Sequence, residues 1–206
     1  FTSRQRRAKA LWDIAGDAGL SSCVVGWWIT APVEEIRGVM VAQTAAPPGS
    51  EGADLRKGGL VAGRSGQVWP GDLEERVFAR AREAAAELPA REAAILGDAS
   101  SWPSSLRDLA GHSRWSLAAD LAYERIALDL LAERDRCDVL LVYVGLPDVL
   151  GHRFWRWTRP GDFAFPPSAQ EVEQYGQVLR RAYEQLDAFV GTLRREAGPS
   201  ATTVLL

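Results

Sequence analysis

Several residue types that mark particular classes of protein are scarce in this 206-residue chain. It contains two cysteines, two histidines and one methionine. A disulfide-dense scaffold and a histidine-rich dinuclear metal centre therefore cannot be built from these residues alone. Cys23 and Cys137 both lie in apolar segments, where a thiol usually behaves as a small buried hydrophobe. We therefore favour buried thiols over a disulfide, and the redox compartment stays open.

The sequence also lacks excess positive charge and any long apolar run. Its formal charge is -3, and no cluster of lysine and arginine follows a groove, so we expect no nucleic-acid polymer as a partner. The apolar run at residues 139–144 is far shorter than the roughly 20 residues that cross a bilayer, so we expect no membrane span. With 47% hydrophobic and 25% charged residues, the chain has the composition of a soluble globular protein.

The two ends of the sequence resemble interior positions of a longer protein. The chain begins with Phe1, and residues 202–206 form an apolar β-type run with nothing after it. We therefore expect that the true N-terminus is not present, which leaves signal peptides and cellular localisation open.

Apolar residues at alternating steps of three and four predict four helices. Ser168 followed by Glu171 forms a capping box, as does Asp72 followed by Glu75. Pro89 is expected to end the second of these helices. The four helices are expected at residues 4–18, 72–87, 113–134 and 168–197.

Short runs of β-forming residues predict strands at 22–29, 38–42, 139–144 and 202–206. The third run is apolar without alternation, so we expect a central strand covered on both faces. Helices alternate with these strands, which predicts a single α/β domain over residues 1–206. Its sheet should be mainly parallel, with helices on both faces and both ends incomplete. Dense glycine and proline predict an irregular excursion at about residues 43–70.

The clearest candidate site follows the strand at 139–144, because ligands of open α/β sheets gather beyond the carboxyl ends of their strands. Asp148 and His152 lie there in a predicted loop, and flanking glycines allow tight turns. A carboxylate and an imidazole four residues apart can converge on one cation, and this donor set suits zinc, manganese or iron better than calcium. In the alternative interpretation, Asp148 caps the turn and His152 is a surface or hydrogen-bonded histidine.

Other residues at these strand ends allow more than one interpretation. The aromatic and arginine residues of segment 153–165 could stack on a base and pair with phosphate, but we favour aromatic rings that fold back on the protein. One of Trp27 and Trp28 should be buried, and the other could border the active cleft beside Thr30. For His112 we favour a structural or exposed role, and for Tyr143 packing within the sheet.

Residues 145–155, Gly-Leu-Pro-Asp148-Val-Leu-Gly-His152-Arg-Phe-Trp, resemble the metal-binding segment of type I phosphodiesterase/nucleotide pyrophosphatase proteins, which belong to the alkaline phosphatase superfamily. Residues 7–14 and 26–41 are similar to the helix and strand that follow the nucleophile in such proteins. Residues 183–191 are similar to the helix before their next site strand. Residues 43–110 match only loosely.

The resemblance implies an alkaline-phosphatase-like fold and a pair of divalent ions. Zinc is the favoured metal, with manganese and iron as alternatives. Asp148 and His152 match the ligands of one ion, which a distant later histidine completes in the family. That histidine, the Thr or Ser nucleophile and the second ion's ligands, including a Ser-Asp-His-Gly motif, have no counterpart in this sequence. The resemblance therefore implies no catalytic nucleophile within the chain, at most one partial metal site, and no turnover by this stretch alone.

The function that we expect is that of a metal-dependent hydrolase of small phosphate esters, of which this chain is a fragment. Another activity of the same superfamily, such as that of a sulfatase, phosphonate hydrolase or phosphomutase, remains an alternative, because fold does not fix function. A second alternative is a non-catalytic α/β binding or interaction domain. No G-x-G-x-x-G follows a predicted strand, which disfavours a dinucleotide-binding domain. The oligomeric state and the substrate stay open.

Overall fold

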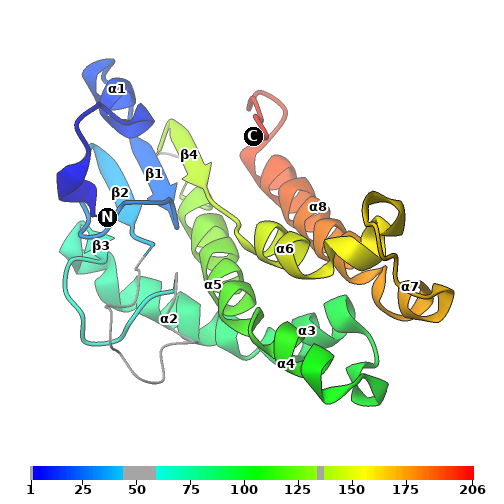
Figure 1. Ribbon diagram of the computed structural model, residues 1–206. Helices are drawn as coiled ribbons and strands as arrows, with labels where there is room; N and C mark the ends of the chain where they lie inside the picture. Colours follow the sequence, from blue (N-terminus) through cyan, green and yellow to red (C-terminus); the bar gives the residue numbers. More distant parts are fainter. Residues whose placement is uncertain (1, 44–58, 134–136) are drawn as a thin grey trace.

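One sheet of four strands forms the centre of the computed structural model, which describes residues 2–43, 59–133 and 137–206 (Figure 1). The strand order is β3-β2-β1-β4; β1 pairs in parallel with both β2 and β4, whereas β3 pairs antiparallel with β2. The α/β class is therefore confirmed, and the sheet is mainly parallel with one antiparallel strand. The strands are β1 (Ser22–Val25), β2 (Gly38–Val41), β3 (Val68–Trp69) and β4 (Val139–Val142).

Helices cover both faces of the sheet, because successive side chains of a strand point to opposite faces. On one face Cys23 and Val25 pack into a core with α5 (Arg114–Leu131) and α2 (Glu74–Ala85). On the other face Val24 packs with Trp12 of α1 (Leu11–Asp17). Figure 1 shows α1 on the opposite side of the strands from α5 and α2.

A second group of helices lies beside the sheet and has a core of its own (Figure 1). Trp102, Phe154 and Tyr175 lie in this core, together with residues from the N-terminal half of α5. None of the helices in the described ranges combines the length and the apolar character that crossing a bilayer requires. The group consists of α3 (Leu88–Leu96), α4 (Ser104–Gly111), α6 (Leu146–Thr158), α7 (Ala169–Tyr175) and α8 (Val178–Ala197).

Two sequence-based helix predictions agree well with the structure. The helix predicted at 113–134 is α5, and the one predicted at 72–87 contains α2. The capping box before α7 is also present: the Ser168 hydroxyl accepts from the backbone N–H of Glu171, whose carboxylate accepts from the backbone N–H of Ser168. The prediction that Pro89 ends a helix is wrong, because Pro89 lies in the first turn of α3, where its missing N–H costs no hydrogen bond. The predicted cap at Asp72 is also wrong, because α2 begins after Leu73 without a side-chain cap.

The helix predicted at 4–18 is shorter than expected. After one 3₁₀ turn (Ser3–Gln5), the chain is irregular, with a bend at Ala8, until α1 begins at Leu11. The carboxylate of Asp13 accepts from the backbone N–H of Ala10, which starts the helix there, and it also pairs with the guanidinium of Arg6. This ion pair holds the preceding segment outside the helix.

The last predicted helix is divided into α7 and α8 at Gly176. A Cβ atom at this position would lie 2.5 Å from the carbonyl oxygen of Val172 and 2.9 Å from that of Trp157. The backbone of α6 therefore approaches Gly176 too closely for a side chain at this point.

Three strand predictions need correction. The strand predicted at 22–29 ends at Val25, because Gly26 adopts φ 68° and the ring of Tyr123 occupies the adjoining space. The run at 139–144 is not central: β4 pairs with β1 alone in the described sheet, and its free edge leaves its residues half-buried. Residues 202–206 form no strand and are exposed.

The irregular excursion predicted at 43–70 lies partly outside the described residues, because 44–58 are not among them. Its last part contains β3, which pairs with β2. The adjacent Gln67 is buried, and its side chain bonds to the backbone of Val61 and Arg64. A short strand therefore closes this segment onto the sheet.

Candidate metal-binding site

The candidate residues lie on α6, and three residues separate this helix from the end of β4. Gly145 is the N-cap of this helix, and Pro147 lies in its first turn. Leu146, Leu150 and Phe154 are buried against the helical core, at the steps of four that mark one helix face. The segment predicted as a loop is a helix. Its apolar residues fall on one face of that helix, and this face is buried against the helical core.

Asp148 and His152 lie on the opposite face of α6 and contact each other. The distance from Asp148 Oδ1 to His152 Nε2 is 3.5 Å, and their side chains are 66% and 79% exposed. The expected convergence of the two side chains is thus found, as an i,i+4 pair one helical turn apart. Because both side chains are exposed, further ligands have access to them from solvent.

The spacing of this pair can accommodate one shared cation. Zinc bonds to carboxylate oxygen and imidazole nitrogen are roughly 2.0–2.2 Å long, and two such bonds at a tetrahedral angle place the donor atoms about 3.4 Å apart. The 3.5 Å separation in this chain agrees with that value. Across the described ranges, however, no group of three or more His, Cys, Asp or Glu side chains is placed to hold a metal ion. The pair supplies two ligands, and the remaining positions need water, substrate or other residues.

Asp120 of α5 is the residue of this site that sequence analysis missed. Its side chain is buried, and its two carboxylate oxygens accept from the backbone N–H groups of Gly145 (3.0 Å) and Leu146 (2.7 Å). Desolvation raises the pKa of Asp120 to about 7, although the two backbone bonds oppose this rise. The available signal was an acidic residue on the apolar face of a predicted helix, next to Leu121 and three positions after Leu117.

Tyr143 follows β4 and connects the candidate site to the end of β1. Its ring packs edge to face against Trp27 and Trp28, with centroids 6.4 and 5.9 Å apart. Desolvation raises the pKa of the phenol, and the negative charges of Asp148 and Asp120 raise it further. Tyr143 is therefore a neutral hydroxyl at physiological pH, and it contacts the aromatic residues at the end of β1 as well as packing beside the sheet.

The two tryptophans lie on a turn rather than on the strand predicted for them. Trp27 is half-buried and Trp28 is 56% exposed, and Ile29 after them has φ 58°. Thr30 is buried; its hydroxyl donates to the carbonyl of Trp27 and accepts from the backbone N–H of Gln43. Thr30 therefore fixes the turn instead of facing a cleft.

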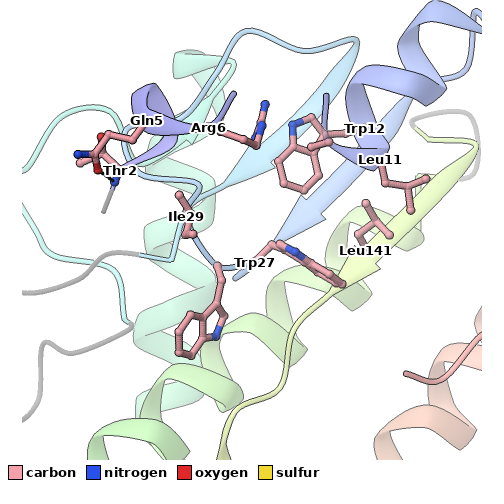
Figure 2. Close-up of a pocket in the computed structure, with 10 residues that line it drawn as sticks. Thr2, Gln5, Arg6, Leu11, Trp12, Trp27, Ile29 and Leu141 are labelled. Carbon is pink, nitrogen blue, oxygen red and sulfur yellow. Dashed lines mark hydrogen bonds between the residues drawn. The ribbon is translucent and has the colours of Figure 1, made fainter. Parts of the chain in front are cut away.

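An apolar cavity of about 390 Å³ lies beside this turn (Figure 2). Trp12, Leu11, Trp27 and Leu141 surround it in Figure 2. Asp148 and His152 do not line this cavity. Trp27 and Trp28 both line this cavity, but the cavity is separate from the candidate metal ligands, so it does not support a tryptophan at the border of the active cleft. Trp28 is linked to the candidate site through its ring contact with Tyr143.

The aromatic residues of segment 153–165 divide into two groups. Phe154 is fully buried and Trp157 is half-buried, and both make ring contacts in the helical core, as the favoured interpretation expected. Trp155, Phe163 and Phe165 are exposed, so the favoured interpretation is wrong for these three residues. The arginines of the segment bond within the protein. Arg153 donates to the carbonyls of Val149 and His112, and Arg156 donates to the carbonyl of Phe165. Arg159 pairs with the carboxylate of Asp162.

His112, the other histidine, is exposed at the C-cap of α4. Its carbonyl accepts from Arg153, as noted above, and its ring belongs to no cluster of ligand residues in the parts of the chain that are described. The exposed role expected for His112 agrees with this position.

No family model, curated protein or solved structure matches this chain.

Proposed function

We propose that this chain supplies Asp148 and His152 as ligands to a divalent metal ion in a phosphodiesterase/nucleotide-pyrophosphatase-like hydrolase of phosphate esters. The observation that carries the proposal is the 3.5 Å separation of a carboxylate oxygen and an imidazole nitrogen beyond the carboxyl end of a parallel strand. The similarity of residues 145–155 to the metal-binding segment of that family supports the same function.

The donor set agrees with zinc, with manganese or iron as alternatives. A divalent ion held by Asp148 and His152 would supply Lewis-acid stabilisation to phosphate oxygens, and the second ion of the family would add to that stabilisation. In this proposal Asp148 and His152 bind metal and transfer no proton. The Thr or Ser nucleophile and the second ion's ligands are not among these 206 residues. An alkaline-phosphatase-like arrangement of the complete protein belongs to the same proposal.

The alternative is a non-catalytic α/β domain in which the pair is a surface ion pair. One observation favours it: both side chains are largely exposed, and an i,i+4 spacing alone brings an aspartate and a histidine together on a helix. Other activities of the superfamily would use the same ligands, so the substrate class is a separate question.

Titration with Zn²⁺ by isothermal calorimetry distinguishes these functions. We expect saturable 1:1 binding that both Asp148→Asn and His152→Gln abolish. His112→Gln is the matched control, because it removes the only other imidazole from an exposed position. Binding that survives in His152→Gln, or no binding in the wild type, would contradict the metal site.

Turnover of bis(p-nitrophenyl) phosphate tests the remaining part of the proposal. We expect none from this chain at saturating Zn²⁺, because the proposal places the nucleophile elsewhere. Clear turnover that the Asp148→Asn variant loses would place a complete catalytic site within these residues and overturn that statement.

A further inference from the structure

The turn between β4 and α6 is fixed by one buried side chain from a distant part of the sequence. Asp120 lies on α5, 25 residues before Gly145 and 26 before Leu146, and it bonds to the backbone N–H groups of both. These two groups belong to the N-cap and the first residue of α6, which have no partner within the helix itself. Asp120 is 4% exposed, so water cannot readily replace these bonds.

The direction of α6 depends on these bonds, because the helix begins immediately after them. Asp148 lies two residues beyond Leu146, and His152 follows one turn later. The i,i+4 spacing brings the two side chains together only while the first turn of α6, which contains Asp148, stays helical. Loss of that turn would change the separation of the carboxylate and the imidazole. Leu150 and Phe154 fix the buried side of the same helix further along, but they do not contact its first N–H groups.

Charge provides a second reason for Asp120 to matter. The N-terminus of a helix carries partial positive charge, which disfavours a cation bound near the first turn. A carboxylate that accepts from the first N–H groups offsets that charge. Above its pKa of about 7, ionised Asp120 therefore lowers the electrostatic cost of a cation near this turn.

We propose that Asp120 is a positioning residue for the Asp148 and His152 pair: it sets the start of α6 and thereby the geometry in which the two ligands meet a metal ion. The expected effect of Asp120 on metal affinity rests on the proposed metal site. The effect of Asp120 on the start of α6 does not, because it concerns the chain without metal.

The test compares Asp120→Asn with Glu124→Gln at pH 8. Asparagine keeps the shape of the side chain but removes its charge, and it turns an N–H group toward one of the two backbone donors. Glu124 lies one turn along α5, is also largely buried with its pKa raised to about 7, and pairs with Arg91 of α3 instead of α6. It is therefore a matched change of charge on the same helix.

Zn²⁺ affinity is the first readout. We expect Asp120→Asn to weaken binding at least about tenfold, the usual effect of removing a group that orients a ligand. Glu124→Gln should bind as the wild type does. A folded Asp120→Asn chain with wild-type affinity would overturn the inference.

Nuclear magnetic resonance without metal provides the second readout. In the wild type, the Gly145 and Leu146 amides should exchange with solvent slowly, unlike most first-turn amides of helices, and rapid exchange at both would overturn the inference without any variant. In Asp120→Asn, the Gly145 and Leu146 amides should exchange faster and the His152 ring signals should shift. In Glu124→Gln, the amide exchange rates and the His152 ring signals should stay as in the wild type. If the wild type binds no Zn²⁺, the proposed function fails. The positioning role is tested separately, because unchanged His152 ring signals in Asp120→Asn would refute it with or without metal binding.

Discussion

The phenol ring of Tyr143 meets the indole ring of Trp28 edge to face, with 5.9 Å between their centroids and an angle of 70° between their planes. These residues follow different strands, β4 and β1, so their contact joins the two strand ends at the edge of the candidate site. Edge-to-face pairs contribute about 0.5–1.5 kcal/mol beyond the area that they bury.

A double-mutant cycle of Trp28→Leu and Tyr143→Leu should therefore show a coupling energy of about 1 kcal/mol in urea unfolding. The control pairs Tyr143→Leu with Trp155→Leu, because Trp155 is exposed to a similar degree, whereas the ring contacts of Tyr143 within the described ranges are to Trp27 and Trp28. Additive effects in the first cycle would mean that the ring contact contributes nothing measurable.

Two glycines on neighbouring elements should respond in opposite directions to alanine. Gly26 has φ 68°, and a Cβ there would lie 2.5 Å from the Tyr123 ring, so Gly26→Ala should lower the free energy of unfolding by at least about 2 kcal/mol. Gly16 lies within α1 with nothing within 4 Å of the added methyl group, so Gly16→Ala should raise it by about 0.5–1 kcal/mol. Thermal unfolding measures both, and a stable Gly26→Ala protein would disprove the close contact with Tyr123.

The free energy of unfolding should fall as the pH rises from about 4.5 to about 7. Burial raises the pKa of Asp120 and of Glu124 to about 7, well above their ordinary values of 3.8 and 4.5. Within this window the unfolded chain has released both protons while the folded chain retains them, so deprotonation favours unfolding by on the order of a few kcal/mol per group.

Urea unfolding across this pH range checks the prediction about Asp120 and Glu124. The double variant Asp120→Asn, Glu124→Gln should have a flatter profile. A wild-type profile that rises through the same window would show that the two carboxylates ionise easily in the folded state.

Ser168→Ala should lower the free energy of unfolding by about 1 kcal/mol, because it removes the side-chain half of the capping box before α7. Ser168→Asp is the informative comparison, since aspartate also accepts from the N3 amide and should retain most of the stability. Equal losses in both variants would mean that the capping bond is not what stabilises this helix start.

Local sequence signals predicted those parts of the structure that depend on neighbouring residues. The apolar stripe of α5, the capping box at Ser168 and the convergence of Asp148 with His152 all arise within a few residues. Helix α6 was mistaken for a loop because its glycines and proline were interpreted as turn signals, whereas Pro147 occupies the first turn, where a proline is tolerated.

The remaining features depend on contacts between distant segments. The Trp157 carbonyl excludes a side chain at position 176, and the ring of Tyr123 fills the space beside Gly26, where β1 has ended. The apolar composition of β4 indicates burial on both faces but cannot show that only one edge is paired. Asp120 could be recognised only as an acidic residue on an apolar face; that it bonds to Leu146 requires the fold.

Acidic side chains on two opposite faces of helix α5 bond to two different helices. The guanidinium groups of Arg76 and Arg80 on α2 bind the carboxylate of Asp129. Asp129 lies about two and a half helical turns beyond Asp120 and so on the opposite face of α5. Helix α5 is therefore bonded through Asp120 to the start of α6 and through Asp129 to α2, so one helix ties the edge of the sheet domain's helical cover to the separate helical core.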